Sequence, residues 1–201
     1  KLRLLSGSHS LLAYLGGLKG CPTIPDCKND PQVEKALRKA LYEEFLPSVA
    51  MPSSISADSY IQQLYSRWSN TTLGDRTSRV GSDGSTKLPQ RIAVPAQKLI
   101  SSGKSPTLMA LILAAWMSAI SPFPDERQNS VCKEMKDPYL AFCKDLVAKS
   151  ENTDDFVHKF FLESSLFSKE LSSSKIFVDL VSKIRKSIFD HGISQAIEQF
   201  I

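Results

Sequence analysis

The sequence has few of the patterns that build β-strands or nucleotide-binding loops. Alternating polar and apolar residues and two-residue hairpin signals, both typical of sheets, are nearly absent from its 201 residues. No G-x-G-x-x-G stretch follows a strand, and no Walker loop is present. These absences favour an all-α fold, and they leave the cofactor-binding residues of any nucleotide-dependent activity unknown.

Cysteine is scarce, and histidine is scarcer. The spacings between cysteines are C-x5-C and C-x10-C, and neither is a zinc-binding or thioredoxin-like spacing. The histidines also lack metal-ligand spacing to one another or to cysteine, so we predict no metal site. We expect mostly buried thiols in a reducing, cytoplasmic compartment. The residues concerned are Cys21, Cys27, Cys132, Cys143, His9, His158 and His191.

Long hydrophobic runs and blocks of like charge are missing too. The most apolar run, 107–120, is shorter than the ~20 residues that cross a bilayer, so it predicts a buried core helix and no membrane partner. The net charge of +4 comes from Lys and Arg scattered among Asp and Glu. Such a mixed surface does not indicate a nucleic-acid partner. With 42% apolar and 23% charged residues, the chain has the composition of an ordinary globular domain.

Helix-start signals recur along the chain. A capping residue precedes proline at Asp30, Ser105 and Asp137, and apolar residues then follow at intervals of three and four. We therefore predict an all-α, multi-helix domain. Besides an opening helix, the expected helices cover 30–45, 56–68, 95–103, 105–120, 137–147, 153–161, 173–192 and 193–200.

The stretch 70–90 lacks this periodicity. It is rich in Thr, Gly, Ser and Asp, and Arg76, Arg79 and Lys87 are spread through it, with Arg91 just beyond. A polar loop of this length in a compact domain is often functional or mobile. The sequence pattern is equally typical of a solvated surface loop.

The first sixteen residues contain a candidate site. On an α-helix, which advances about 100° per residue, Lys1, Ser6 and His9 share one face, and Gly7 gives a ligand room to approach the backbone. These groups could handle an alcohol or a carbonyl. The apolar run 11–15 fits an ordinary packed helix with a lone histidine equally well. Spacing alone leaves both interpretations open.

Several segments resemble a known family. The opening, Lys1-Leu-Arg-Leu-Leu-Ser6-Gly-Ser-His9-Ser-Leu-Leu-Ala-Tyr-Leu-Gly16, resembles K-L-R-x-L-N-G-S-H-S-x-L-A-Y-L-G of the mannitol dehydrogenase family of long-chain polyol and hexuronate dehydrogenases. Residues 82–91 resemble its D-G-S-Q-K-L-P-Q-R block, and 60–70 its Y-x-x-x-L-x-x-R-F-x-N stretch, with Trp68 in the aromatic place. Residues 115–117 also fit, so the resemblance covers essentially the whole chain.

The resemblance implies a helical domain similar to the C-terminal domain of 6-phosphogluconate dehydrogenase. In the family this domain binds substrate, carries the catalytic residues and packs against an N-terminal Rossmann domain that binds NAD or NADP. Residues 1–201 would then be one such domain, a fragment without its Rossmann partner. The expected cofactor would be bound mainly by that missing domain.

The resemblance also implies roles for individual residues. Lys1 corresponds to the general acid/base, and His9 to the residue that orients the reacting oxygen. Arg79 and Lys87 correspond to substrate-contacting residues. Ser6 departs from the family pattern, which has Asn in this place as a donor to the developing alkoxide. A hydroxyl is shorter than an amide, so full activity is in question.

The implied activity is a metal-independent oxidoreductase that interconverts a sugar ketone and a secondary alcohol, of the fructuronate/mannonate or the fructose/mannitol type. The block ending in Lys87-Leu-Pro-Gln-Arg91 leans toward the hexuronate branch. A different class remains open: a non-catalytic helical interaction or dimerisation module that keeps the family fold. Converging Lys1, His9 and Lys87 side chains would distinguish the enzyme from the module.

Overall fold

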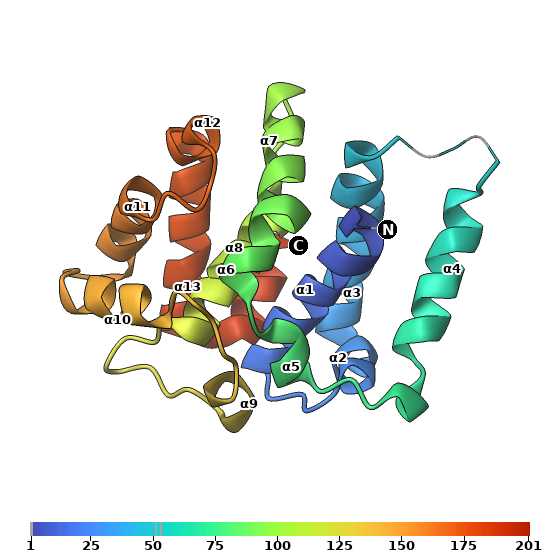
Figure 1. Ribbon diagram of the computed structural model, residues 1–201, viewed down its shortest axis with the longest axis horizontal. Coiled ribbons are helices and arrows are strands. Elements are labelled where there is room, and N and C mark those ends of the chain that lie inside the picture. The colour runs from blue at the N-terminus through green and yellow to red at the C-terminus, as the bar shows by residue number, and fades with distance from the viewer. Residues whose placement is uncertain (1, 51, 53) are drawn as a thin grey trace.

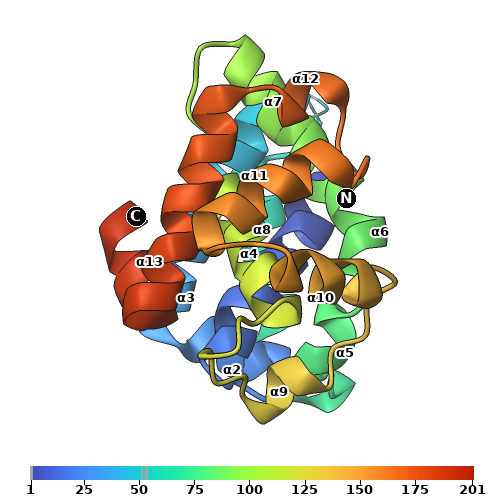
Figure 2. The ribbon, with the colours of Figure 1, turned by 90° about the vertical axis from the view of Figure 1, so that its left-hand side faces the viewer.

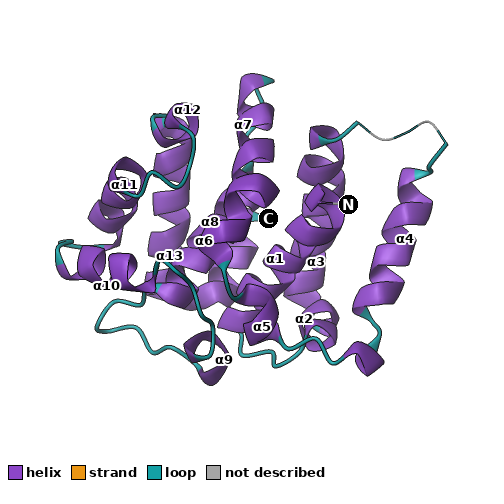
Figure 3. Cartoon of the chain, viewed as in Figure 1, coloured by secondary structure: helices purple, strands orange, loops and turns teal. Residues whose placement is uncertain are grey.

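The computed structural model describes residues 2–50, 52 and 54–201. Within these residues the chain forms helices and no β-strand, as Figure 3 shows, and its sole β-bridge joins Thr23 to Arg76. The prediction of an all-α, multi-helix domain is therefore confirmed. None of the described helices is both long and apolar enough to span a membrane.

The helices follow one another along the chain, with longer connections before α4 and between α8 and α9 (Figure 1). The α-helices are α1 (Ser8–Leu11), α2 (Ile24–Asn29), α3 (Pro31–Ala40), α4 (Ala57–Trp68), α5 (Thr77–Gly81), α6 (Gly84–Leu88), α7 (Val94–Ser101), α8 (Thr107–Ile120), α9 (Ser130–Lys133), α10 (Leu140–Ala148), α11 (Thr153–Glu163), α12 (Lys169–Ser172) and α13 (Lys175–Phe200). The π-helical segments are η1 (Leu2–Gly7), η2 (Leu12–Gly16), η3 (Leu41–Phe45) and η6 (Pro89–Ala93). The 3₁₀ turns are η4 (Leu46–Ser48) and η5 (Thr71–Leu73).

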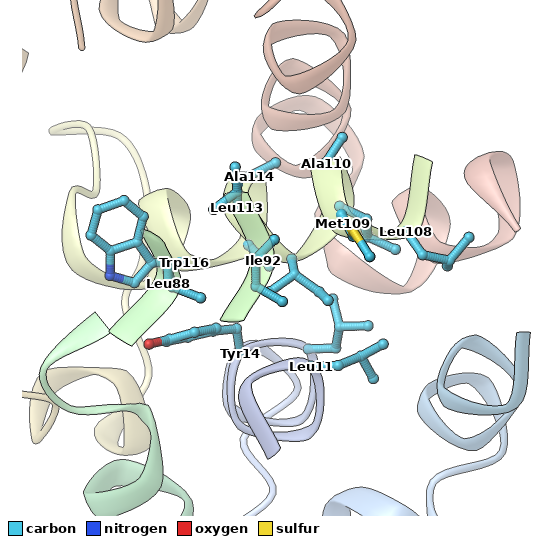
Figure 4. Packing of buried hydrophobic residues seen from close by; sticks show 14 of the residues in the cluster. Leu11, Tyr14, Leu88, Ile92, Leu108, Met109, Ala110, Leu113, Ala114 and Trp116 are labelled. Atoms are coloured by element: carbon cyan, nitrogen blue, oxygen red, sulfur yellow. The ribbon is translucent and has the colours of Figure 1, made fainter. Parts of the chain in front are cut away.

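Helix α8 forms the centre of the core. Every residue from Leu108 to Ile120 is buried, which confirms the interpretation of this apolar run as a core helix. Helix α13 packs along it, and α11 covers α13 in turn (Figure 2). In Figure 4, side chains of the opening helix and of the helix 84–101, Tyr14 and Ile92 among them, point toward α8. The two segments that carry the candidate site therefore share one hydrophobic core.

Several helix boundaries follow the sequence signals. Asp30 caps α3 by accepting hydrogen bonds from the backbone N–H groups of Gln32 and Val33. Gly192, with φ of 80°, breaks α13 where the sequence predicts a helix end. Of the cysteines, Cys27, Cys132 and Cys143 are buried thiols, whereas Cys21 is half-buried; all four are free.

Other boundaries differ by one to three residues. Asn152, and not Thr153, caps α11 by accepting from the N–H groups of Asp154 and Asp155. Helix α10 begins at Leu140, and Asp137 accepts from the Tyr139 N–H just before it while its second carboxylate oxygen accepts from Ser85 and Trp116. The last helix starts after Ser174.

The expected short helix beginning at Pro95 is wrong in its start, because α6, η6 and α7 form one continuous helix from Gly84 to Ser101. Pro89 and Pro95 both lack an N–H donor, which interrupts the regular α-helical hydrogen bonds. The π-helical register between them carries the chain past this interruption without ending the helix.

The prediction of a polar loop over 70–90 is wrong for α5 and α6. These two short helices are held by contacts with residues distant in sequence. The Tyr14 hydroxyl donates to the Gly81 carbonyl at 2.9 Å, and the Ser85 N–H donates to the Asp137 carboxylate at 3.0 Å. Because these partners lie elsewhere in the chain, hydrophobic periodicity within 70–90 gives no signal for the helices.

The turn between α5 and α6 depends on Gly84. Asp83 adopts the left-handed conformation, with φ of 57°, and thereby redirects the chain. A Cβ atom on Gly84 would lie 2.5 Å from the Tyr14 hydroxyl oxygen, and closer still to the Trp116 indole nitrogen. The glycine therefore allows α6 to approach the opening helix and α8.

A buried carboxylate caps α8. Glu44 is only 4% exposed, and its two oxygens accept from the N–H groups of Leu108, at 2.6 Å, and Met109, at 2.9 Å. Pro106, the N-cap residue of α8, offers no side-chain acceptor of its own. Burial raises the pKa of Glu44 to about 7, although the two backbone donors oppose this shift.

Replacing Glu44 by alanine should therefore destabilise the fold. The Glu44→Ala change leaves two buried N–H groups without acceptors, and we expect a loss of about 2–5 kcal/mol in the free energy of unfolding. Urea denaturation measures this loss. The exposed neighbour offers a matched control: Glu43→Ala should cost less than about 0.5 kcal/mol. Equal losses for the two variants would contradict the capping role.

The close approach at Gly84 gives a second prediction. Gly84→Ala should lower the free energy of unfolding by about 1–3 kcal/mol, because the added methyl group overpacks the contact with Tyr14 and Trp116. Thr86→Ala, at an exposed position of the same helix, is the control and should change stability little. A Gly84→Ala variant as stable as the wild type would show that the contact relaxes freely.

Candidate active site

The opening helix runs from Leu2 through η1, α1 and η2 without a break. Its first segment, η1, is π-helical, with hydrogen bonds between residues i and i+5. The advance of 100° per residue, assumed for an α-helix, is therefore wrong for this segment. Ser6 and His9 are nevertheless both half-buried, whereas Ser8 and Leu11 are fully buried. Lys1 lies outside the described residues, so its placement on this face stays a prediction.

His9 packs against an aromatic ring. Its imidazole meets the Trp68 indole edge-on, with ring centroids 6.1 Å apart, and Trp68 is the last residue of α4. Burial lowers the pKa of His9 to about 4; the Asp75 carboxylate opposes this shift, and the positive charges of Arg67 and Arg91 add to it. The imidazole is therefore neutral near pH 7, and it can both donate and accept a hydrogen bond.

Arg79 lies on the exposed side of the residues around His9. Its side chain is 72% exposed, and its guanidinium pairs with the Asp75 carboxylate four residues earlier. Asp75 is held in place through its backbone, since its carbonyl accepts from the Ile24 N–H at 3.0 Å. The same carboxylate acts on the pKa of His9. Asp75 therefore pairs with Arg79 and acts on His9 through its charge alone, and the sequence did not identify it as a site residue.

Lys87, on α6, is more buried than Arg79. Its Nζ donates to the Ser82 carbonyl at 2.6 Å and stands 3.9 Å from the Asp83 carboxylate. Its side chain is only 27% exposed. Burial lowers the pKa of Lys87, and the charge of Arg91 lowers it further.

Arg91 joins the two sequence blocks. Its Nη1 lies 3.4 Å from both the Ser6 carbonyl oxygen and the Ser10 hydroxyl oxygen. Burial lowers the pKa of Arg91 as well. Residues more than eighty positions apart in the chain thus meet at Arg91, with Ser6 and His9 on one side and Lys87 on the other.

The structure therefore brings Ser6, His9 and Lys87 into one neighbourhood and leaves Arg79 at its edge. The sequence motifs did not identify Asp75 or Arg91 as site residues. Each stands four residues from a predicted site cation, a spacing that makes neighbours on a helix, but the sequence predicted a loop over 70–90 and so gave no such signal.

Two cavities bear on the location of the site. A cavity of about 360 Å³ lies between the opening helix and α4, lined by Leu5, Tyr60, Gln63, Leu64 and Arg67. Its volume is within the range of small-ligand pockets. A larger cavity of about 660 Å³ lies between the segment 118–132 and the end of α13, and none of the predicted site residues lines it. None of the predicted site residues lines the smaller cavity either, but Leu5 of that cavity precedes Ser6 in the chain, and its Arg67 acts on the pKa of His9.

The described residues do not fit the pyrophosphate of a dinucleotide. That group is usually bound by a glycine-rich turn from a strand into a helix, and the described part of the chain contains no strand. The same residues contain no group of three or more His, Cys, Asp or Glu side chains placed to hold a metal ion.

Known proteins share this fold and sequence. The profile of the mannitol dehydrogenase C-terminal domain matches residues 1–189. D-mannonate oxidoreductase of Escherichia coli (strain K12) is 34% identical over 197 residues, which are 98% of this chain and 40% of that protein. Mannitol 2-dehydrogenase of Phaeosphaeria nodorum is 30% identical over 200 residues, covering 100% of this chain and 34% of its own length.

A solved structure of a dehydrogenase has the same fold as this chain. Mannitol 2-dehydrogenase of Pseudomonas fluorescens, in a ternary complex with NAD and D-mannitol, superposes with a TM-score of 0.87 at 28% identity, over 99% of this chain and 39% of that one. The present chain thus spans about 40% of the length of these dehydrogenases. From its sequence and its fold alike, the chain belongs to the mannitol dehydrogenase family and corresponds to the C-terminal domain of its members.

Proposed function

We propose that this chain is the substrate-binding and catalytic domain of an NAD(P)-dependent, metal-independent dehydrogenase that interconverts a sugar ketone and a secondary alcohol. The observation that carries the proposal is the meeting of Ser6, His9, Lys87 and Arg91 at one seam between the opening helix and α6–η6, in a chain of this family. The substrate types are fructuronate/mannonate or fructose/mannitol, by analogy with the named relatives.

The proposed chemistry assigns each residue one task. Lys1 moves the proton of the reacting oxygen, and this role follows from the resemblance of its motif. A lysine at its usual pKa of ~10.4 is a weak base at pH 7, so the role requires burial or cationic neighbours that lower the pKa. The neutral imidazole of His9 donates a hydrogen bond to the same oxygen and fixes its orientation. Ser6 supplies a hydroxyl donor where relatives of this motif supply an amide.

The substrate chain would extend from this centre toward the cations. Lys87 and Arg79 would donate hydrogen bonds to its remaining oxygens, and Asp75 would keep Arg79 in position. When bound, the nicotinamide supplies hydride transfer at the substrate carbon. The residues that hold it would belong to the N-terminal Rossmann domain, the partner that we propose for this chain within the whole enzyme.

The serine at position 6 supports a second kind of function, a non-catalytic interaction module. Ser6 replaces the amide that normally stabilises the alkoxide, and loss of such a donor costs roughly 3–4 kcal/mol of transition-state stabilisation in other enzymes. A chain with this loss could serve as a non-catalytic helical interaction module. The burial that keeps His9 neutral favours the enzyme, because a docking module has no need of it.

The Ser6 position supplies the direct test of the proposed function. In the full-length protein, we expect NADH- or NADPH-dependent reduction of at least one of fructuronate, tagaturonate and fructose. Ser6→Asn should raise kcat by ~10- to 100-fold, because the longer amide reaches the developing alkoxide. Thr86→Asn is the control for adding an amide at an exposed position and should leave kcat unchanged. A folded protein that binds nucleotide but reduces none of the three, with or without Asn, would support the interaction module.

The pKa of His9 gives a second prediction. Exchange of the imidazole C2 hydrogen, followed by mass spectrometry over a pH series, should place His9 well below 6.5 in the full-length protein. His158 is the internal control: its hydrogen bond to the Asp154 carbonyl and its contact with Asp179 raise its pKa. Burial makes His9 bind its proton less tightly in the folded protein than in the unfolded chain. As the pH falls from 6.5 to 4, the unfolded chain therefore takes up a proton at His9 first, and the free energy of unfolding decreases. A His9 pKa at or above 6.5 would contradict the neutral role.

A further inference from the structure

Two cysteines meet at the end of the opening helix. Cys21 lies in the turn that follows η2, and Cys27 lies within α2. The Cys21 N–H donates to the Gly16 carbonyl at 2.9 Å. Gly16 also touches the second cysteine, because a Cβ atom on this glycine would overlap Cys27 Sγ. Both cysteines are therefore held against Gly16, and their two side chains share a hydrogen bond.

The backbone between the two cysteines fixes this contact. Gly20 adopts the left-handed conformation, with φ of 83°, and so reverses the chain after η2. Thr23 then caps α2 by accepting from the Asp26 N–H, and the Cys27 N–H donates to the Thr23 carbonyl at 3.0 Å. The C-x5-C spacing alone does not indicate the contact, because it depends on this turn.

Cys21 has the properties of a thiol that oxidants attack. It is half-buried, so its side chain is partly open to solvent. The hydrogen bond from Cys27 lowers the pKa of the Cys21 thiol, and the charge of Lys19 lowers it further. Burial and two nearby carboxylates, those of Asp30 and Asp26, oppose this shift. A lowered pKa favours the thiolate, which is the nucleophilic form of cysteine.

Cys27 has the properties of a resolving thiol, the second cysteine that reacts with an oxidised neighbour. It is fully buried, and its hydrogen bond to Cys21, together with burial, raises its pKa. The Thr77 hydroxyl oxygen also lies 3.3 Å from Cys27 Sγ. A buried thiol of this kind reacts with a sulfur already beside it and is shielded from oxidants in solvent. An accessible thiol of low pKa next to a resolving cysteine is the usual arrangement of a redox-sensing site.

The other two cysteines lack these properties. Cys132 and Cys143 are buried, and burial raises their pKa values to about 12 and about 11. Among the residues that the structure describes, neither shares a hydrogen bond with another thiol. They therefore serve as internal controls for the reactivity of Cys21.

We propose that Cys21 and Cys27 are a modification site, at which hydrogen peroxide forms a reversible disulfide. The Cys21 thiolate attacks one peroxide oxygen: an S–O bond forms, the O–O bond breaks, and hydroxide leaves with the electron pair. The Cys27 sulfur then attacks the sulfenic sulfur of Cys21, so that an S–S bond forms and the S–O bond breaks. The second hydroxide leaves as water with the Cys27 proton, and the proton that Cys21 gave up converts the first hydroxide to water.

Two thiols and one peroxide thus become one disulfide and two waters. A dithiol reverses the modification by thiol–disulfide exchange and is itself oxidised to a disulfide. The site lies at the far end of the opening helix from Ser6. It does not depend on the proposed dehydrogenase function.

Mass spectrometry of the full-length protein tests the site directly. Trypsin cuts after Lys19 and Lys28, so both cysteines fall in one peptide, 20–28. The protein is treated with dilute hydrogen peroxide, denatured, alkylated and digested. We expect peptide 20–28 to lose two hydrogens and to take no alkyl group, and to recover two alkylated thiols after treatment with dithiothreitol. The peptides that contain Cys132 and Cys143 should stay fully alkylated.

Two variants separate the roles of the two thiols. Cys27→Ala leaves Cys21 without a resolving partner, so peroxide should produce a sulfenic acid at Cys21 that dimedone labels. Cys21→Ser should leave Cys27 reduced, because burial shields it. Cys132→Ala is the matched control and should form the disulfide in peptide 20–28 as the wild type does. Circular dichroism checks that each variant is folded.

Three results would overturn the inference. The first is a wild-type peptide 20–28 that still carries two alkylated thiols after peroxide treatment. The second is oxidation of all four cysteines to the same extent, which would indicate that the fold does not select this pair. The third is addition of oxygen to Cys21 while Cys27 stays alkylated, which would remove the resolving role of Cys27.

Discussion

One buried carboxylate organises the part of the fold on which the site depends. Asp137 accepts hydrogen bonds from the Ser85 N–H, the Trp116 indole N–H and the Tyr139 N–H, at 3.0, 3.2 and 2.9 Å. It thereby joins the start of α6 to the central helix α8 and to the segment that leads into α10. A buried charge is stable only with such donors, so these elements take one relative position. The orientation of α6 then sets where Lys87 and Arg91 point.

The candidate site is a seam between two helices. Neither the opening helix nor the helix 84–101 contains all of the candidate groups, and the Arg91 side chain extends from the second helix to Ser6 and Ser10 on the first. Both helices include π-helical segments next to the seam, η1 and η6. Such segments occur frequently at functional sites. The seam forms only when both helices pack against α8.

Burial, more than neighbouring charge, sets the protonation states at this seam. It is the main cause that lowers the pKa values of His9, Lys87 and Arg91. The same effect raises the pKa of Glu44, which caps the start of α8 and is not one of the candidate site residues. Desolvation acts on any titratable group, so a shifted pKa indicates a site only where several groups converge. The seam meets that condition, whereas Glu44 has two backbone donors that explain it as a helix cap.

Local chemistry in the sequence was sufficient to predict much of the fold. Asp30 before Pro31 caps a helix, the apolar run 107–120 becomes the core helix, and Gly192 ends its helix, because each signal acts within a few residues. The two motif blocks likewise predicted Ser6, His9 and Lys87 as site residues, and the structure brings these three into one neighbourhood.

Tertiary contacts decided the rest. Helices α5 and α6 replace the expected loop because Tyr14 and Asp137 supply hydrogen bonds from far along the chain. The neutral state of His9 depends on packing against Trp68, and the joining role of Arg91 depends on two helices meeting. The sequence by itself determined the helices that have caps and apolar periodicity, since these act locally, and it named the candidate site residues. Which groups meet, and with what charge, depended on burial, which exists only once the chain is packed.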